Sequence, residues 1–205
     1  MINIKEFDVK KFDSILARGL SNGLGKQGSQ VCIEAAVCEA LGLPHGDDPG
    51  CVANSVRSFK IRLNDSRWSA EKARAAGLRD LGLAQLGSKG VVDGVEFMKR
   101  VAEKTIRVLI PKIFKLTFPT NKACLIAAAR CAEEGTKEAA AAAAQVGAAA
   151  AAAYAADAAA AYAAHAAAAA QVGAAAVAAD EYLILSAKIA LEVLRELNSP
   201  GIALL

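Results

Sequence analysis

The chain has 205 residues and a formal net charge of +3, with 24 Lys and Arg against 21 Asp and Glu. Hydrophobic residues make up 55% of the chain but aromatic residues only 5%, because alanine supplies much of the apolar fraction. This composition excludes collagen, a disulfide-rich miniprotein and a disordered acidic tail. The length suits one domain, or one domain with an extension.

Capping residues and glycines predict a series of helices in the first 120 residues. Helix starts are predicted at Asn3 with Glu6, at Ser29, at Asp48 before Pro49, at Ser69, and at Asp93 with Glu96. Pro111 is expected to kink or end the helix that follows Asp93. Since no segment alternates strictly between apolar and polar residues, we expect no strand and an all-α fold.

The second part of the chain is rich in alanine, the strongest helix former. Alanine occupies 30 of the 41 positions from 139 to 179, and the helical region is expected to begin at Thr120 or Asn121. Two interpretations compete: one continuous helix over 121–197, or turns near Gly147 and Gly173 that give three antiparallel helices. We favour folding back into a helical hairpin or bundle, because a lone alanine rod buries little surface.

These elements divide the chain into a helical domain with a basic surface (1–120) and an alanine-rich extension with an amphipathic C-terminal helix (121–205). The strings SNGLGKQG, VCIEAAVCEALGLPHGDDPGCV, VRSFKIRLNDSRW and ARAAGLRDLGLAQLGS, followed by KGVVDGVEF and EKTIRVLIPKIF, resemble a family of uncharacterised bacterial and phage proteins. The resemblance implies a single evolutionary unit and brings no activity, cofactor or catalytic residue.

A glycine-rich link and a basic stretch are the candidate ligand-binding segments. In the link, Gly23, Gly25 and Gly28 with Lys26 match GxGxxG directly before a predicted helix start, a pattern that suits phosphate. The preceding segment reads as helix, which argues against a dinucleotide-binding fold. The competing interpretation is a flexible link between helices.

The basic stretch lies over residues 54–89, where 8 basic side chains accompany 3 acidic ones. The candidate ligand contacts there are Arg57, Lys60, Arg62, Arg67 and Trp68, whose ring can stack on a base. The alternative is a solvated surface with Trp68 in the core. This charge excess is too small to predict a nucleic-acid-binding domain.

A third candidate is the loop over residues 45–51. His45, Asp47 and Asp48 offer an imidazole and two carboxylates, a weak candidate metal site for a hydrolase. Turn and capping roles explain the same residues. A stripe of Tyr154, Asp157, Tyr162 and His165 suits a pocket or a subunit contact. Another stripe holds Cys124 and Cys131, which we interpret as small buried hydrophobes.

The cysteines and the longest uncharged stretch bear on the compartment. The five cysteines form no CxxC pair, which predicts reduced thiols in a cytoplasmic protein. Between Asp157 and Asp180 lie 22 uncharged residues, long enough to cross a bilayer. Membrane spans depend on Leu, Ile, Phe and Val rather than on alanine, so we expect no membrane helix.

The sequence thus predicts non-enzymatic binding, or sequestration, of a small phosphate-bearing ligand such as a nucleotide. The proposed contacts are the glycines at 23, 25 and 28, Lys26 and the basic stretch, with no cofactor. The alternatives are a structural protein that forms homo-oligomers through its alanine helices and a metal-dependent hydrolase that uses the 45–51 loop.

Overall fold

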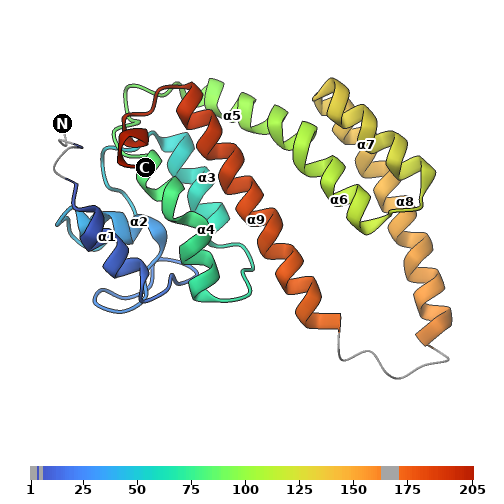
Figure 1. Cartoon of the computed structure of the whole chain (residues 1–205), viewed down its shortest axis with the longest axis horizontal. Coiled ribbons are helices and arrows are strands. Elements are labelled where there is room, and N and C mark those ends of the chain that lie inside the picture. The colour runs from blue at the N-terminus through green and yellow to red at the C-terminus, as the bar shows by residue number, and fades with distance from the viewer. Residues whose placement is uncertain (1–3, 5–6, 163–170) are drawn as a thin grey trace. The chain divides into compact units, whose positions relative to one another are not determined.

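The computed structural model is all-α, as predicted (Figure 1). It describes the backbone of residues 4, 7–162 and 171–205, and the side chains of that set outside 153–179. Within these residues the regular elements are helices, and extended pairing is limited to isolated bridges from Val31 to Leu20 and to Gly25. The α-helices are α1 (Val9–Leu16), α2 (Ile33–Ala40), α3 (Asn54–Asn64), α4 (Glu71–Ala84), α5 (Gly94–Lys104), α6 (Ile110–Thr117), α7 (Lys122–Glu134), α8 (Lys137–Tyr162) and α9 (Gln171–Glu196).

The chain forms two compact units that do not divide at residue 120. The first unit comprises residues 1–100 and 175–205, and the second comprises residues 101–174. Most of α9 therefore belongs with the N-terminal helices rather than with the alanine-rich segment. A 3₁₀ turn, Pro200–Leu204, follows α9 in the first unit.

Helix α2 lies at the centre of the first unit. Its residues Ile33 to Cys38 are all buried, and Ile33, Ala36 and Val37 share one helix face through their i, i+3 and i+4 spacing. Side chains from other helices complete the core: Phe12, Leu78, Leu81, Phe97, Val193 and Leu194. The ring of Trp68 and the side chain of Ile184 lie over Gly77 of α4, where a Cβ atom would come within 2.5 Å of the ring. Trp68 is therefore a core residue.

One carboxylate, that of Asp180, links α9 to the loop before α4. Asp180 of α9 is buried. Its carboxylate accepts hydrogen bonds from the Ser69 amide at 2.9 Å and from the Ser69 hydroxyl. Ser69 was expected to cap α4, but α4 begins at Glu71 with Ala70 at the N-cap position. The Ser69 hydroxyl is unavailable to α4 because Asp180 holds it.

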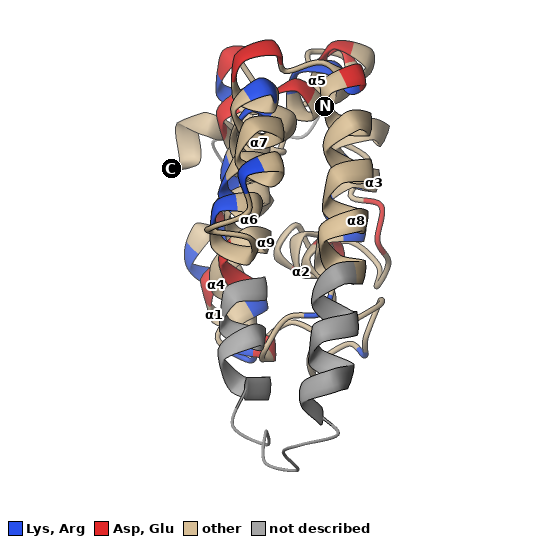
Figure 2. Cartoon of the chain, turned by 90° about the vertical axis from the view of Figure 1, so that its right-hand side faces the viewer, with Lys and Arg blue, Asp and Glu red and all other residues tan. Residues whose placement is uncertain are grey.

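The second unit packs three helical segments around small side chains. Its core consists of Phe114 from α6, Cys124, Ala128 and Cys131 from α7, and Ala139, Ala143 and Ala150 from α8. Both cysteines are fully buried, as expected for small hydrophobes. Figure 2 shows α8 as a largely uncharged helix after its first turn.

The alanine-rich segment folds back at positions other than those expected. Helix α8 runs through Gly147, and α9 includes Gly173, so neither glycine forms a turn. Within residues 121–162, the helical run is interrupted at Gly135, which ends α7 in a left-handed conformation with φ 64°. Gly147 packs closely against Phe114, since a Cβ there would lie 3.0 Å from the ring. The predicted stripe of Tyr154, Asp157, Tyr162 and His165 lies outside the described side chains.

Pro111 neither ends nor breaks the helical run. A π-helical turn, Thr105–Leu109, precedes it and continues directly into α6. The Ile110 amide donates to the Thr105 carbonyl, the wider i to i−5 bond of a π turn. This widened turn accommodates the proline ring, which cannot donate a hydrogen bond.

Helix starts follow the sequence only in part. The Asp93 carboxylate accepts from the Val95 and Glu96 amides at 2.8 and 2.9 Å, which confirms the predicted start of α5. Asn121 likewise caps α7. The predicted starts at Ser29 and Asp48 are wrong: α2 begins at Ile33 and α3 at Asn54. Asn3 and Glu6 lie outside the described residues, and Asp8 caps α1.

Candidate ligand-binding site

The glycine-rich link is a closed loop held by its own backbone. The Ser21 backbone amide donates to the Val31 carbonyl at 3.0 Å, and the Lys26 backbone amide donates to the Gln30 carbonyl at 3.0 Å. Gly25, at φ 73°, lets the two sides meet, because a Cβ there would overlap the Gln30 carbonyl oxygen. Gly25 therefore allows the link to close into a loop that backbone hydrogen bonds hold.

The loop does not present its amides to an external phosphate in the expected way. The Gly23 amide donates to the Asp65 carboxylate at 2.9 Å, so the chain's own anion occupies this position. Lys26 and Gly28 are exposed, and neither lines the cavities described below.

The basic residues of α3 and the following loop point to different places. The Arg57 Nη2 atom lies 2.6 Å from the Asp47 carboxylate, while Lys60 is fully buried. Arg62 and Arg67 are exposed to solvent. Trp68, whose indole N–H donates to the Leu63 carbonyl at 2.9 Å, offers no face to a ligand. The predicted contacts therefore do not gather around one cavity.

The glycine link, the 45–51 loop and α3 do meet at a small polar pocket of about 50 Å³. Its lining residues are Gly23, Leu24, Cys32, Ile33, Glu34, Asp47, Ile61, Asn64 and Asp65. Three of these side chains are carboxylates, and the volume suits one or two water molecules rather than a nucleotide. The three sequence segments thus converge, but on a cavity that disfavours phosphate.

A buried ion pair borders this pocket. The Lys60 ammonium lies 3.2 Å from Glu34 Oε1, and both side chains are 0% exposed. Gln85 donates to the other Glu34 oxygen at 2.9 Å. Burial raises the pKa of Glu34 and lowers the pKa of Lys60, and their mutual attraction opposes both shifts. Lys60 therefore serves the interior of the first unit and is not a ligand contact.

The 45–51 loop is held by other partners rather than by a metal-binding arrangement. Asp47 pairs with Arg57, Asp48 accepts from the Gly50 amide at 2.9 Å, and His45 Nε2 lies 3.4 Å from the Gly25 carbonyl. In the part of the chain that the structure describes, no three His, Cys, Asp or Glu side chains are grouped to hold a metal ion. The geometry gives the hydrolase alternative no support.

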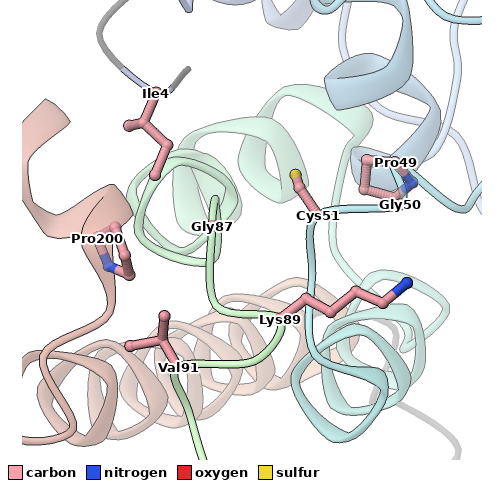
Figure 3. Close-up of a pocket in the computed structure, with 8 residues that line it drawn as sticks. All are labelled: Ile4, Pro49, Gly50, Cys51, Gly87, Lys89, Val91 and Pro200. Atoms are coloured by element: carbon pink, nitrogen blue, oxygen red, sulfur yellow. The ribbon is translucent and has the colours of Figure 1, made fainter. Parts of the chain in front are cut away.

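A larger pocket of about 610 Å³ lies elsewhere in the first unit (Figure 3). Its lining residues are Ile4, Pro49, Gly50, Cys51, Gly87, Lys89, Val91 and Pro200. In Figure 3, Ile4, Val91 and Pro200 lie on one side, Pro49, Gly50 and the Lys89 ammonium on the other, and the Cys51 sulfur between them. The volume is within the range of small-molecule sites.

Hydrogen bonds between chain segments hold the walls of this pocket together. The Lys89 amide donates to the Cys51 carbonyl at 3.1 Å, which joins two of the walls. The Ser199 hydroxyl donates to the Ala84 carbonyl at 2.6 Å, and the Gly201 amide donates to the Leu86 carbonyl at 2.9 Å, which fixes Pro200 beside the end of α4. Gly87 has φ 72°, and a Cβ there would overlap Ile4. These hydrogen bonds give the pocket a defined shape.

The electrostatic character of the larger pocket differs from that of the polar one. Among its eight described lining residues, Lys89 carries the charge and none is Asp or Glu. Lys89 is exposed and has no ion-pair partner among the described residues. Ile4, Pro49, Val91 and Pro200 supply an apolar surface. A positive group at the edge of an apolar cavity favours an anionic ligand.

Cys51 is the accessible thiol at this site. It is half-buried and lines the pocket, whereas Cys32, Cys38, Cys124 and Cys131 are buried. Burial also raises the pKa of the Cys38 thiol to about 12. Because the thiolate is the reactive form, thiol reagents are expected to modify Cys51 before the others.

Sequence reasoning missed Lys89, Cys51 and Pro200 as neighbours. Gly87 and Gly90 flank Lys89, both with positive φ, and Pro49 and Gly50 precede Cys51. These turn signals show where loops occur but not that two loops and the end of α9 form one cavity.

Comparisons with protein-family models, curated proteins and solved structures find no match for this chain. In the described part of the chain, no helix combines the length and the apolar character that a membrane crossing requires.

Proposed function

We propose that the chain binds a small anionic ligand in the 610 Å³ pocket without catalysing a reaction on it. The observation that carries the proposal is the exposed, unpaired ammonium of Lys89 at the edge of a fixed apolar cavity. Compared with the sequence prediction, the ligand stays anionic but the contacts move from the glycine link to the Cys51 and Lys89 loops. A multiply charged nucleotide is disfavoured because the described lining residues include a single cation.

A thermal melting screen tests binding by mass action. A ligand that binds the folded chain at 100 times its Kd adds about 2.7 kcal/mol to the free energy of unfolding, and so raises Tm. The panel contains nucleotides, sugar phosphates, inorganic phosphate, and aliphatic and aromatic carboxylates. Unfolding is followed by the fluorescence of Trp68, the single tryptophan, which is buried in the first unit.

Alkylation of Cys51 locates the binding. A true ligand is expected to slow the reaction of Cys51 with N-ethylmaleimide, measured by mass spectrometry of the modified peptide. Lys26→Met, a control variant changed at an exposed lysine outside the pocket, is expected to show the same protection of Cys51 by the ligand as the wild-type chain. If no member of the panel raises Tm or protects Cys51, the proposed function is wrong.

A further inference from the structure

The larger pocket also specifies the class of its ligand, an inference that rests on the proposed function. We infer that this pocket takes a bulky apolar molecule with a single negative charge, such as an organic carboxylate or sulfonate, with its charged group at Lys89. The inference is specific about the number of charges and about the apolar body.

The charge count follows from the lining. Lys89 is the single charged residue among the eight that form the described lining, so it can neutralise one negative charge. A diphosphate or triphosphate would bring further charge into a cavity whose described lining has no second cation, and burying an unpaired charge is costly. The Gly50 amide, which is near Lys89 in Figure 3, already donates to Asp48 at 2.9 Å. A monoanion is therefore favoured over a nucleotide.

The wall opposite the Lys89 ammonium favours an apolar ligand body. Ile4, Val91 and Pro200 face the cavity from the side away from the Lys89 ammonium (Figure 3). Val91 is 54% exposed, so its side chain offers apolar surface to a ligand in the pocket. Burial of apolar surface contributes about 25 cal/mol per Å², so this wall favours rings or an alkyl chain over a sugar.

The nearby polar pocket provides an internal contrast. Its carboxylates Glu34, Asp47 and Asp65 repel an anion, and its volume is about 50 Å³. An apolar anion is therefore excluded there by charge and by size. Such a probe is therefore expected at the Lys89 pocket rather than at the polar pocket.

The test uses two fluorescent probes that differ mainly in one charged group. The dye 1-anilinonaphthalene-8-sulfonate is an apolar monoanion, and N-phenyl-1-naphthylamine is its neutral counterpart. We expect the full chain to bind the sulfonate dye more tightly than the neutral dye. Octanoate should displace the sulfonate dye, whereas AMP and inorganic phosphate should not.

Variants assign the binding to Lys89 and to the pocket. Lys89→Met should weaken binding of the sulfonate dye about fivefold, which corresponds to the loss of one partly exposed ion pair. Binding of the neutral dye should be unchanged. Lys26→Met, at another exposed lysine, should change neither. Reaction of Cys51 with N-ethylmaleimide should abolish dye binding to the full chain, and the same treatment should have no effect on Cys51→Ser.

One result overturns the ligand class while leaving the proposed function intact: protection of Cys51 by AMP or another phosphate compound but not by octanoate. Equal protection by the neutral and the sulfonate dyes, with no effect of Lys89→Met, overturns both the ligand class and the proposed binding of an anion. Unchanged dye binding after Cys51 is modified, or equal losses in Lys89→Met and Lys26→Met, would place the dye elsewhere and overturn the inference. Absence of protection by every compound contradicts both proposals.

Discussion

Lys60 was expected to face a ligand, but its ammonium lies in the interior beside Glu34, which is also fully buried. Arg57 and Lys60 are three residues apart on α3 and so share a helix face, but helical position does not specify which of the two cations pairs with a buried carboxylate. A buried pair of this kind contributes little net stability, because the loss of hydration offsets the attraction, but removing one partner strands the other charge.

Replacing Lys60 therefore has a pH-dependent effect. Burial holds the pKa of Glu34 above its ordinary value of 4.5, and the Lys60 charge opposes this rise. In Lys60→Met the folded-state pKa of Glu34 rises further. The protonated carboxyl stabilises the folded chain fully below pH 4.5, and this contribution is lost as the pH rises through the folded-state pKa. We expect a loss of about 3–5 kcal/mol at neutral pH and a smaller loss at pH 5.

Urea unfolding of Lys60→Met at pH 5 and pH 7, followed by Trp68 fluorescence, measures this difference. The double variant Glu34→Gln with Lys60→Met is the control, since neither position then titrates, and its stability should depend less on pH. An equal loss for Lys60→Met at both pH values would contradict the assignment of the buried charge to Glu34.

At the scale of elements, the end of α7 depends on a residue from the preceding π-helical turn. The Arg107 guanidinium donates to the carbonyls of Ala132 at 3.1 Å and Glu134 at 2.9 Å, and also to that of Glu133. These carbonyls lie in the last turn of α7 and lack helical donors. Positive charge at a helix C-terminus is also favourable. Arg107 therefore fixes the break at Gly135.

Removing this cap should destabilise the second unit. Arg107→Met keeps the apolar part of the side chain and is expected to cost about 1.5–3 kcal/mol, the value of hydrogen bonds to a charged group. Arg130→Met is the matched control, because it removes an exposed pair with Glu134 worth about 0.3–0.5 kcal/mol. Urea unfolding followed by far-ultraviolet circular dichroism compares the two. Equal losses would mean that the cap contributes nothing beyond a surface ion pair.

Helix identity was readable from the sequence, while several boundaries and the fold-back were not. The capping carboxylate of Asp93 is a local signal, and the structure confirms it. Ser69 fails as a cap because Asp180, far away in the sequence, takes its hydroxyl. Gly147 resembles a turn residue, yet its role is contact with Phe114. The errors arise where a tertiary contact overrides a local preference.

At the scale of the whole molecule, the first unit combines both ends of the sequence. Residues 175–205 supply Asp180, Val193 and Leu194 to the same unit as residues 1–100. The candidate pocket has the same origin, since Pro200 lines it together with Cys51 and Lys89. A sequence pattern locates such residues but does not show that they are neighbours, which explains why the glycine link was the expected site.

A fragment of residues 1–120 should therefore fail to fold as a stable domain. It lacks the buried face of α9, the Asp180 contact to Ser69 and the hydrogen bonds that hold Pro200. We expect its Trp68 emission to shift to longer wavelength and its thermal transition to lose cooperativity relative to the full chain. A cooperative transition with unchanged emission would show that the N-terminal helices form an independent domain.

The π-helical turn Thr105–Leu109 also changes the direction, around the helix axis, in which the following side chains point. Such a turn accommodates one additional residue, and each residue of an α-helix advances the direction of the side chain by about 100°. Deleting one residue from this turn would keep the helix-forming composition but rotate Phe114 relative to Val101, and so withdraw its ring from Gly147. The tolerance of the chain to single-residue length changes is thus expected to be lower here than in the exposed loops.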